Sequence, residues 1–136
     1  VPIGKAKVVQ EGSDITLVSH SRMLLMCQEA VKELKKLGVT CDLIDLRTIK
    51  PLDSATIAAS VKKTGKCLCV EEGHIFTGIS AEIAFQIQEQ CFDYLDAPVA
   101  RVCQRETPMP YSKTLERETL PTVERIVHAA RQVVSI

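Results

Sequence analysis

The sequence lacks several features that would indicate a particular class of protein. Its 17 basic and 17 acidic side chains cancel, so no excess of one charge predicts binding to nucleic acid or to an anionic membrane. No apolar run approaches the roughly 20 residues that are needed to cross a bilayer. The first residues also lack the apolar core of a secretory signal. We therefore expect a soluble chain whose 136 residues are about the size of one compact domain.

Familiar short motifs of catalysis and cofactor binding are missing as well. There is no GxSxG segment, and the two glycines of "GHIFTG" fit neither the dinucleotide-binding nor the P-loop pattern. The six cysteines include no CxxC pair, and most of them lie within apolar runs. This placement is typical of reduced cysteines packed in a core rather than of a disulfide framework or a zinc site. Reduced cysteines favour the cell interior as the setting.

The sequence does contain an alternation of strand-like and helix-like segments. Short runs rich in β-branched residues predict strands at "AKVVQ", "ITLVS", "CDLIDL", "CLCVE" and "VARVC". Apolar residues at helical spacing predict helices over 22–37, from 53 to about 63, from about 78 to 90, and from about 122 to 134. Gly38 is suited to end the first helix and Asp53 to cap the second. Such alternation predicts an α/β fold with helices on both faces of a parallel sheet.

A sheet of this kind has a crevice where its winding direction reverses. If "ITLVS" is the central strand, "SHSR" and "EEGHIFTG" face each other across that crevice. We predict that five side chains gather there: His20, Arg22, Glu71, Glu72 and His74. One interpretation is an anion-binding or acid-base loop at the start of a helix. The other is a tight connection whose polar residues face water or another chain, and two adjacent carboxylates, which repel phosphate, favour it.

Two local predictions accompany this crevice. Ser19 or Ser21 is suited to cap the first helix, whereas Arg22 in its first turn is unfavourable for the helix dipole unless Glu71 or Glu72 lies nearby. The irregular segment 105–121 contains three prolines, which exclude regular strand pairing, together with apolar residues that can anchor it. We expect this segment to form an ordered strap over the domain or over a neighbouring chain.

Five longer segments carry a resemblance to a known family. They are "VPIGKAKVVQEGSDITLVSHSR", "DLIDLRTIKPLD", "VEEGHIFTGISAEIA", "FDYLDAPVARV" and "TPMPYSKTLE". Together they resemble the C-terminal domain of the β subunit of 2-oxo acid dehydrogenase E1 components, most closely those of the pyruvate dehydrogenase type. The resemblance implies a transketolase C-terminal-like domain over residues 1–136. Its fold would be three-layer α/β/α, with a five-stranded, mostly parallel sheet and "AKVVQ" as an antiparallel edge strand beside "CDLIDL".

The resemblance also implies what the longer parent protein does. Its family uses thiamine diphosphate and magnesium to decarboxylate a 2-oxo acid and to acylate the lipoyl group of an acyltransferase. In this family a GDG-type motif of the α subunit and a glutamate in the N-terminal domain of the β subunit serve the cofactor. No GDG occurs in this sequence. We therefore expect a fragment that contains no catalytic, cofactor-binding or metal-binding residue and is catalytically silent alone.

The implied role of the fragment is assembly. The partners would be the E1 α subunit, a second β subunit and the subunit-binding domain of the dihydrolipoyl acyltransferase. Asp96 in "YLDAP" and the terminal Ile136 match docking positions of the family. The setting would be bacterial cytoplasm or the mitochondrial matrix. Two alternatives stay open: the same domain of a branched-chain enzyme, which "IQEQCF" and "RVCQRETPMP" also resemble, and a stand-alone module that binds an anion or a nucleotide in the crevice.

Overall fold

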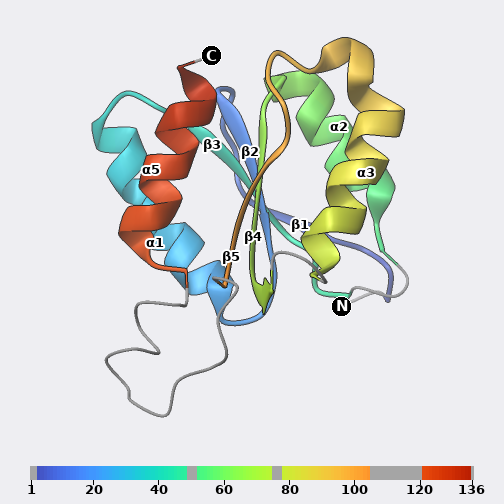
Figure 1. The fold of residues 1–136 in the computed structure, drawn as a ribbon, viewed down its shortest axis with the longest axis horizontal. Coiled ribbons are helices and arrows are strands. Elements are labelled where there is room, and N and C mark those ends of the chain that lie inside the picture. The colour runs from blue at the N-terminus through green and yellow to red at the C-terminus, as the bar shows by residue number, and fades with distance from the viewer. Residues whose placement is uncertain (1–2, 49–51, 75–77, 105–120, 136) are drawn as a thin grey trace.

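A five-stranded sheet forms the middle layer of the domain (Figure 1). The structure is a computed structural model that describes residues 3–48, 52–74, 78–104 and 121–135. The strands are β1 (Lys7–Gln10), β2 (Ile15–Ser19), β3 (Cys41–Asp45), β4 (Cys67–His74) and β5 (Ala100–Gln104). Their order is β1-β3-β2-β4-β5, with β1 antiparallel to β3 and the other neighbours parallel. The predicted sheet, with its antiparallel edge strand and its central β2, is confirmed.

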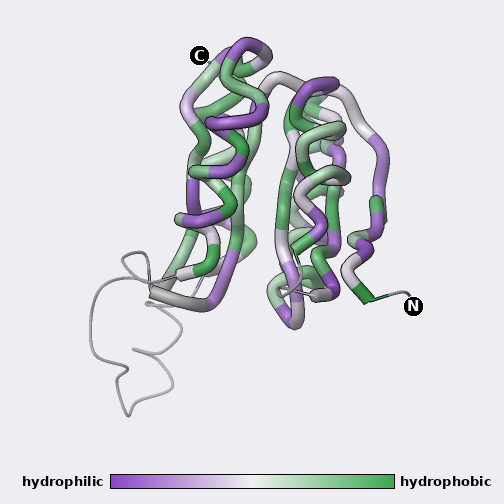
Figure 2. The backbone as a smooth tube through the Cα atoms, turned by 90° about the vertical axis from the view of Figure 1, so that its right-hand side faces the viewer, coloured by the Kyte–Doolittle hydropathy of each residue, from purple (hydrophilic) through white to green (hydrophobic). Residues whose placement is uncertain are grey.

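Two pairs of helices cover the sheet. Helices α1 (Met23–Lys36) and α5 (Val123–Val134) lie on one face, and α2 (Ser54–Thr64) and α3 (Ile79–Cys91) lie on the other (Figure 1). A short 3₁₀ turn, η1 (Phe92–Tyr94), follows α3 directly. Figure 2 shows hydrophobic and hydrophilic residues alternating along the helices, as expected for elements that bury one side against a sheet. The three-layer α/β/α prediction is therefore confirmed.

The sheet separates two apolar cores because successive side chains of a strand point to opposite faces. Leu17 of β2 and Leu68 of β4 belong to the core beneath α1 and α5. Val18 of β2 and Cys69 of β4 belong to the core beneath α2 and α3. All five residues of β2 are buried, and its boundaries coincide with the predicted run. Thr16 is tolerated there because its hydroxyl bonds to Ser60 Oγ and to Thr64 Oγ1, both at 2.7 Å.

Most helix ends follow the predicted capping. Asp53 caps α2, with its Oδ1 accepting a hydrogen bond from the Thr56 N–H at 3.2 Å. Gly38 follows α1 with φ +83°, a conformation that suits glycine. The predicted serine cap of α1 is wrong: Arg22 occupies the cap position, and no side chain caps this helix. Ser19 is buried at the end of β2, where its Oγ donates to the Val70 carbonyl at 3.0 Å, and Ser21 adopts φ 58°.

The end of β4 also differs from the prediction. The predicted strand "CLCVE" ends at Glu71, but β4 continues through Glu72 to His74. Val70 and His74 both pair with β5, and the register shifts between them. This extension matters because residues in a strand alternate between two faces, whereas residues in a loop do not.

All six cysteines are free and buried, as predicted. Burial raises the pKa of Cys27 and of Cys41 to about 12, so these thiols stay protonated and unreactive near neutral pH. Of the helices that the structure describes, none is long and apolar enough to span a bilayer. The predicted strap lies almost wholly outside the described residues, as does Ile136.

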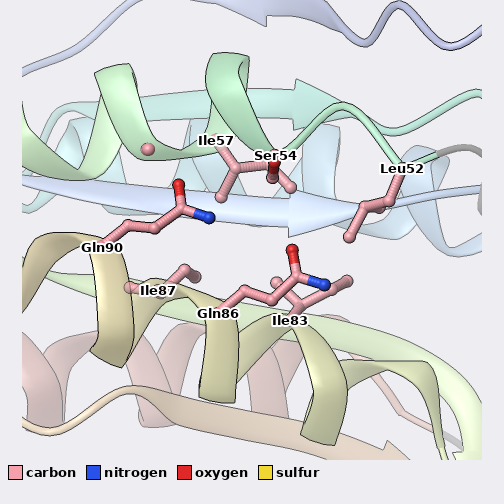
Figure 3. Close-up of a pocket in the computed structure, with 8 residues that line it drawn as sticks. Leu52, Ser54, Ile57, Ile83, Gln86, Ile87 and Gln90 are labelled. Atoms are coloured by element: carbon pink, nitrogen blue, oxygen red, sulfur yellow. The ribbon is translucent and has the colours of Figure 1, made fainter.

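Helices α2 and α3 pack closely along a shared seam. Figure 3 shows Ile57 of α2 together with Ile83 and Ile87 of α3 in this seam, with Gln86 and Gln90 extending from α3 between the two helices. The hollow that they leave has a volume of about 10 Å³. This is about the space of one water molecule, so the seam is packing rather than a ligand pocket.

A buried carboxylate ties three segments together. Asp42 of β3 accepts hydrogen bonds from the Gly12 N–H at 3.0 Å, from Ser60 Oγ at 2.6 Å and from Lys63 Nζ at 2.8 Å. Burial by itself would raise the pKa of Asp42, but hydrogen bonds from Lys63, Ser60 and Gly12 outweigh it and hold the pKa below its usual range. Asp42 thereby joins the β1–β2 turn, the sheet and α2.

We predict that Asp42→Asn lowers the free energy of unfolding by about 2 kcal/mol at neutral pH, since hydrogen bonds to charged groups contribute about that much. The folded-state pKa of Asp42 lies below its unfolded value. Its contribution is therefore present above the unfolded pKa of about 3.9 and is lost as the pH falls through the folded pKa. In urea unfolding between about pH 6 and about pH 2, the free energy of unfolding should fall less steeply with acid in the variant than in the unmodified protein. Asp93 is exposed, so Asp93→Asn is the control. An equal decrease in the free energy of unfolding in both variants would contradict the prediction.

Candidate functional site

The crevice predicted from the sequence lies where parallel strands β2 and β4 end side by side. Arg22 precedes α1, and its Nη2 lies 2.8 Å from Oε2 of Glu72 on β4. This ion pair connects the two segments that were expected to face each other. The Arg22 and Glu72 side chains are 61% and 36% exposed, so the pair contributes less than about 1 kcal/mol. Glu72 is the acid that offsets the unfavourable position of Arg22 at the helix start.

Glu71 points to the opposite face of the sheet. It is only 4% exposed, and its Oε1 accepts hydrogen bonds from the Ser80 N–H at 3.1 Å and from Ser80 Oγ at 2.5 Å. Arg101 of β5 donates from Nε to Ser80 Oγ at 2.8 Å and places Nη2 4.0 Å from Glu71. Glu71 therefore accepts a backbone hydrogen bond from the first turn of α3, and Arg101 connects this turn to β5. The alternation of β4 divides the predicted cluster between the two faces of the sheet.

The two histidines add little to this site. His20 is half-buried, and it makes no hydrogen bond or ion pair with any residue that the structure describes. His74 ends β4, and its backbone is in register with Gln104 of β5, while its side chain lies outside the description. The structure thus brings Arg22 and Glu72 into contact and places Glu71 in a separate network.

The chemistry available at the crevice is limited. Its arginine already pairs with a carboxylate, and the second carboxylate serves a helix end. Within residues 3–48, 52–74, 78–104 and 121–135, no group of three or more His, Cys, Asp or Glu side chains could hold a metal ion. These residues are a poor fit for magnesium and for a diphosphate, because the carboxylates oppose an anion and no arrangement of ligands serves a cation. We interpret the crevice as a structural connection.

The opposite end of the domain presents a different surface around Asp96. Figure 1 shows the turn that follows α3 and the last turn of α5 at this end, away from the arrowhead of β4. The Asp96 N–H donates to the Gly65 carbonyl at 2.8 Å, which fixes the backbone against the end of α2. The Asp96 side chain is exposed and has no hydrogen bond or ion pair among the described residues. Its carboxylate is therefore free to meet another chain.

Exposed aromatic side chains accompany Asp96, and the sequence prediction missed them. Phe92 and Tyr94 of η1 are 68% and 52% exposed. Lys62 of α2 places its Nζ 5.3 Å from the centre of the Tyr94 ring. Large exposed aromatic side chains near one another are a common mark of interaction surfaces. The signal in the sequence was the segment "FDYLD", in which apolar and acidic residues alternate after a helix.

Comparison with known proteins identifies the fold family. The family described as "Transketolase, C-terminal domain" matches residues 4–126. The chain belongs to this family. Among solved structures, a split-gene transketolase described as an inactive beta4 tetramer superimposes with a TM-score of 0.86 at 24% identity, covering 99% of this chain and 43% of that one. At this identity the likeness concerns the fold of the transketolase C-terminal domain.

The curated relatives narrow the resemblance. The pyruvate dehydrogenase E1 component subunit beta of Dictyostelium discoideum, a mitochondrial protein, is 49% identical over 133 residues, which are 98% of this chain and 37% of that protein. The mitochondrial human subunit beta is 46% identical over 137 residues, covering 100% of this chain and 38% of that protein. The subunit beta of Rickettsia bellii is 44% identical over 98% of this chain and 41% of that protein. This transketolase C-terminal domain therefore spans well under half the length of these relatives.

The two adjacent glutamates of β4 provide a matched test of the site. We predict that Glu71→Ala lowers the free energy of unfolding by about 2 to 3 kcal/mol, because it leaves the buried Ser80 donors unsatisfied. Glu72→Ala removes an exposed ion pair and should cost less than about 1 kcal/mol. Urea unfolding of both variants at neutral pH measures the difference. Equal losses would show that the two carboxylates do not lie on different faces.

Proposed function

We propose that this chain is the assembly and partner-docking domain of a pyruvate dehydrogenase E1 β subunit. The identity of 44–49% to subunits of that name, over nearly the whole chain, is the observation that carries the proposal. The relatives' names favour pyruvate over a branched-chain substrate. Fold-level likeness alone would not decide the function, because one fold serves many activities.

In this proposal the parent enzyme decarboxylates pyruvate with thiamine diphosphate and magnesium, and it reductively acetylates the lipoyl group of the acyltransferase. The described residues of this domain do not fit either cofactor component, since the crevice carboxylates oppose a diphosphate and no ligand set for a cation is present. In this proposal the cofactor is held by other parts of the parent enzyme. The domain's own contribution is to hold chains together in bacterial cytoplasm or in the mitochondrial matrix.

Three partners follow from the proposal: the E1 α subunit, a second β subunit and the subunit-binding domain of the dihydrolipoyl acyltransferase. Asp96 and Ile136 are the proposed contacts for the acyltransferase domain. The Asp96 carboxylate is exposed and has no partner among the described residues, which supports this role. A carboxylate at the edge of an interface steers and orients a basic partner more than it adds affinity. Arg22, Glu72 and the two histidines, His20 and His74, remain further interface candidates. Glu71 is no longer a candidate, because it is buried against α3.

A test of docking compares two neighbouring carboxylates. In the full-length β subunit assembled with its α subunit, Asp96→Ala should weaken binding of the acyltransferase's subunit-binding domain by about tenfold, which corresponds to about 1.4 kcal/mol. Asp93→Ala removes an exposed charge three residues away and should change the affinity by less than about twofold. Titration calorimetry gives both values. Unchanged affinity in Asp96→Ala would remove Asp96 from the docking site.

A second test moves the Asp96 carboxylate without removing it. A Cβ at Gly65 would lie within 2.3 Å of Asp96 Oδ2, whereas a Cβ at Gly38 meets nothing within 4 Å. Both glycines have positive φ, so each alanine variant should lose about 1 kcal/mol of stability. Only Gly65→Ala should displace the carboxylate, and only that variant should weaken acyltransferase-domain binding. Equal binding by Gly65→Ala and Gly38→Ala would show that the position of Asp96 is irrelevant to docking.

A further inference from the structure

A groove lies beside Asp96, between the end of α3 and the start of β5. Its volume is about 510 Å³, and we call it the η1 groove. Gln88 and Asp96 line it together with the apolar side chains of Phe92, Leu95, Pro98 and Val99. A charged contact at Asp96 does not by itself need an apolar groove beside it. The lining of the groove therefore bears on which side chains a partner would present.

The apolar part of the groove is open to water. Phe92 is 68% exposed although it is a large aromatic side chain, and Pro98 is exposed as well. Leu95 and Val99 are half-buried and pack against the core beneath α2 and α3. Leu95 and Val99 are thus held by the fold, while Phe92 offers an aromatic ring for contact. An apolar side chain of a partner would cover this surface and remove it from water.

The charge of the groove has one sign. Among the described residues that line the groove, Asp96 is the charged one. Between Gln88 and Val99 the sequence contains Glu89, Asp93 and Asp96 but no Lys or Arg. The Asp96 carboxylate lies against Gly65, at the carboxyl end of α2, where the helix dipole is negative. This position disfavours an unpaired carboxylate and favours one that is matched by a cation. The nearby Lys62 lies over the Tyr94 ring instead.

We propose that the η1 groove selects a partner segment in which a lysine or arginine lies next to an apolar side chain. The cation pairs with Asp96, and the apolar side chain enters the groove against Phe92. This inference rests on the proposed function, because it takes the docked partner to be the subunit-binding domain of the acyltransferase. It adds an apolar contact that determines specificity to an interaction otherwise described by charge.

The experiment uses two exposed phenylalanines of one continuous helical segment. Phe92 lines the groove, whereas Phe85 of α3 is 61% exposed and does not line it. In the assembled full-length subunit, Phe92→Ala should weaken binding of the acyltransferase's subunit-binding domain at least about tenfold, as truncation of an interface hot spot does. Phe85→Ala should change it less than about twofold. Raising the salt concentration should abolish the effect of Asp96→Asn and leave the effect of Phe92→Ala, because salt screens charge pairs and not apolar contacts.

The outcomes separate this inference from the proposed function. If Asp96→Asn weakens binding and Phe92→Ala does not, docking at Asp96 stands and the role of the groove is wrong. If Phe92→Ala and Phe85→Ala weaken binding equally, the groove has no special role and the inference is also overturned. If neither Asp96→Asn nor Phe92→Ala changes the affinity, the docking function itself fails. Thermal unfolding of each variant checks that the fold is intact. Both rings are largely exposed, so we expect their truncation to leave the fold intact.

Discussion

The burial of β2 on both faces is the constraint on which the rest of the structure depends. Each of its five residues is enclosed, so each must be apolar or have its polar group satisfied. Thr16 meets this condition through Ser60 and Thr64 of α2, and Ser19 meets it through a carbonyl of β4. These bonds fix α2 and β4 relative to the central strand. The register of the neighbouring strands then decides where every later polar residue lies.

Successive side chains of a strand point to opposite faces of the sheet, and this helps to explain why one end of the sheet is structural and the other end is suited to interaction. Glu71 and Glu72 are neighbours in the sequence, yet one is buried against α3 and the other pairs with Arg22 at the surface. Both carboxylates are thereby satisfied within the domain. Asp96 has no such partner among the described residues, because the turn after α3 holds its backbone against Gly65 and leaves its side chain exposed. An unsatisfied charge beside exposed aromatic rings is a feature of surfaces that meet other chains.

Much of the fold could be predicted because its signals are local. The β2 run, the Asp53 cap and the glycine after α1 each depend on a few adjacent residues, and each occurs as predicted. The serine cap of α1 is wrong because Arg22 occupies the cap position. Ser19 Oγ is bonded instead to a carbonyl of β4, which is distant in the sequence, and Ser21 precedes the cap with φ 58°. The predicted end of this strand at Glu71 is wrong because β4 continues to pair with β5 as far as His74. In both cases a tertiary contact outweighed a local preference.

The sequence by itself determined the order of the elements, the reduced cysteines and the resemblance to a family, since periodicity and short motifs are written in adjacent residues. The antiparallel edge strand followed from the resemblance and not from these local patterns. Only the tertiary structure decided that Glu71 and Glu72 have partners within the domain and that Asp96 has none among the described residues. That outcome depends on which face of β4 each glutamate occupies and on how the turn after α3 meets the end of α2. It also decided that Phe92 borders a groove beside Asp96. Contacts of this kind join residues far apart in the chain, so no local pattern contains them.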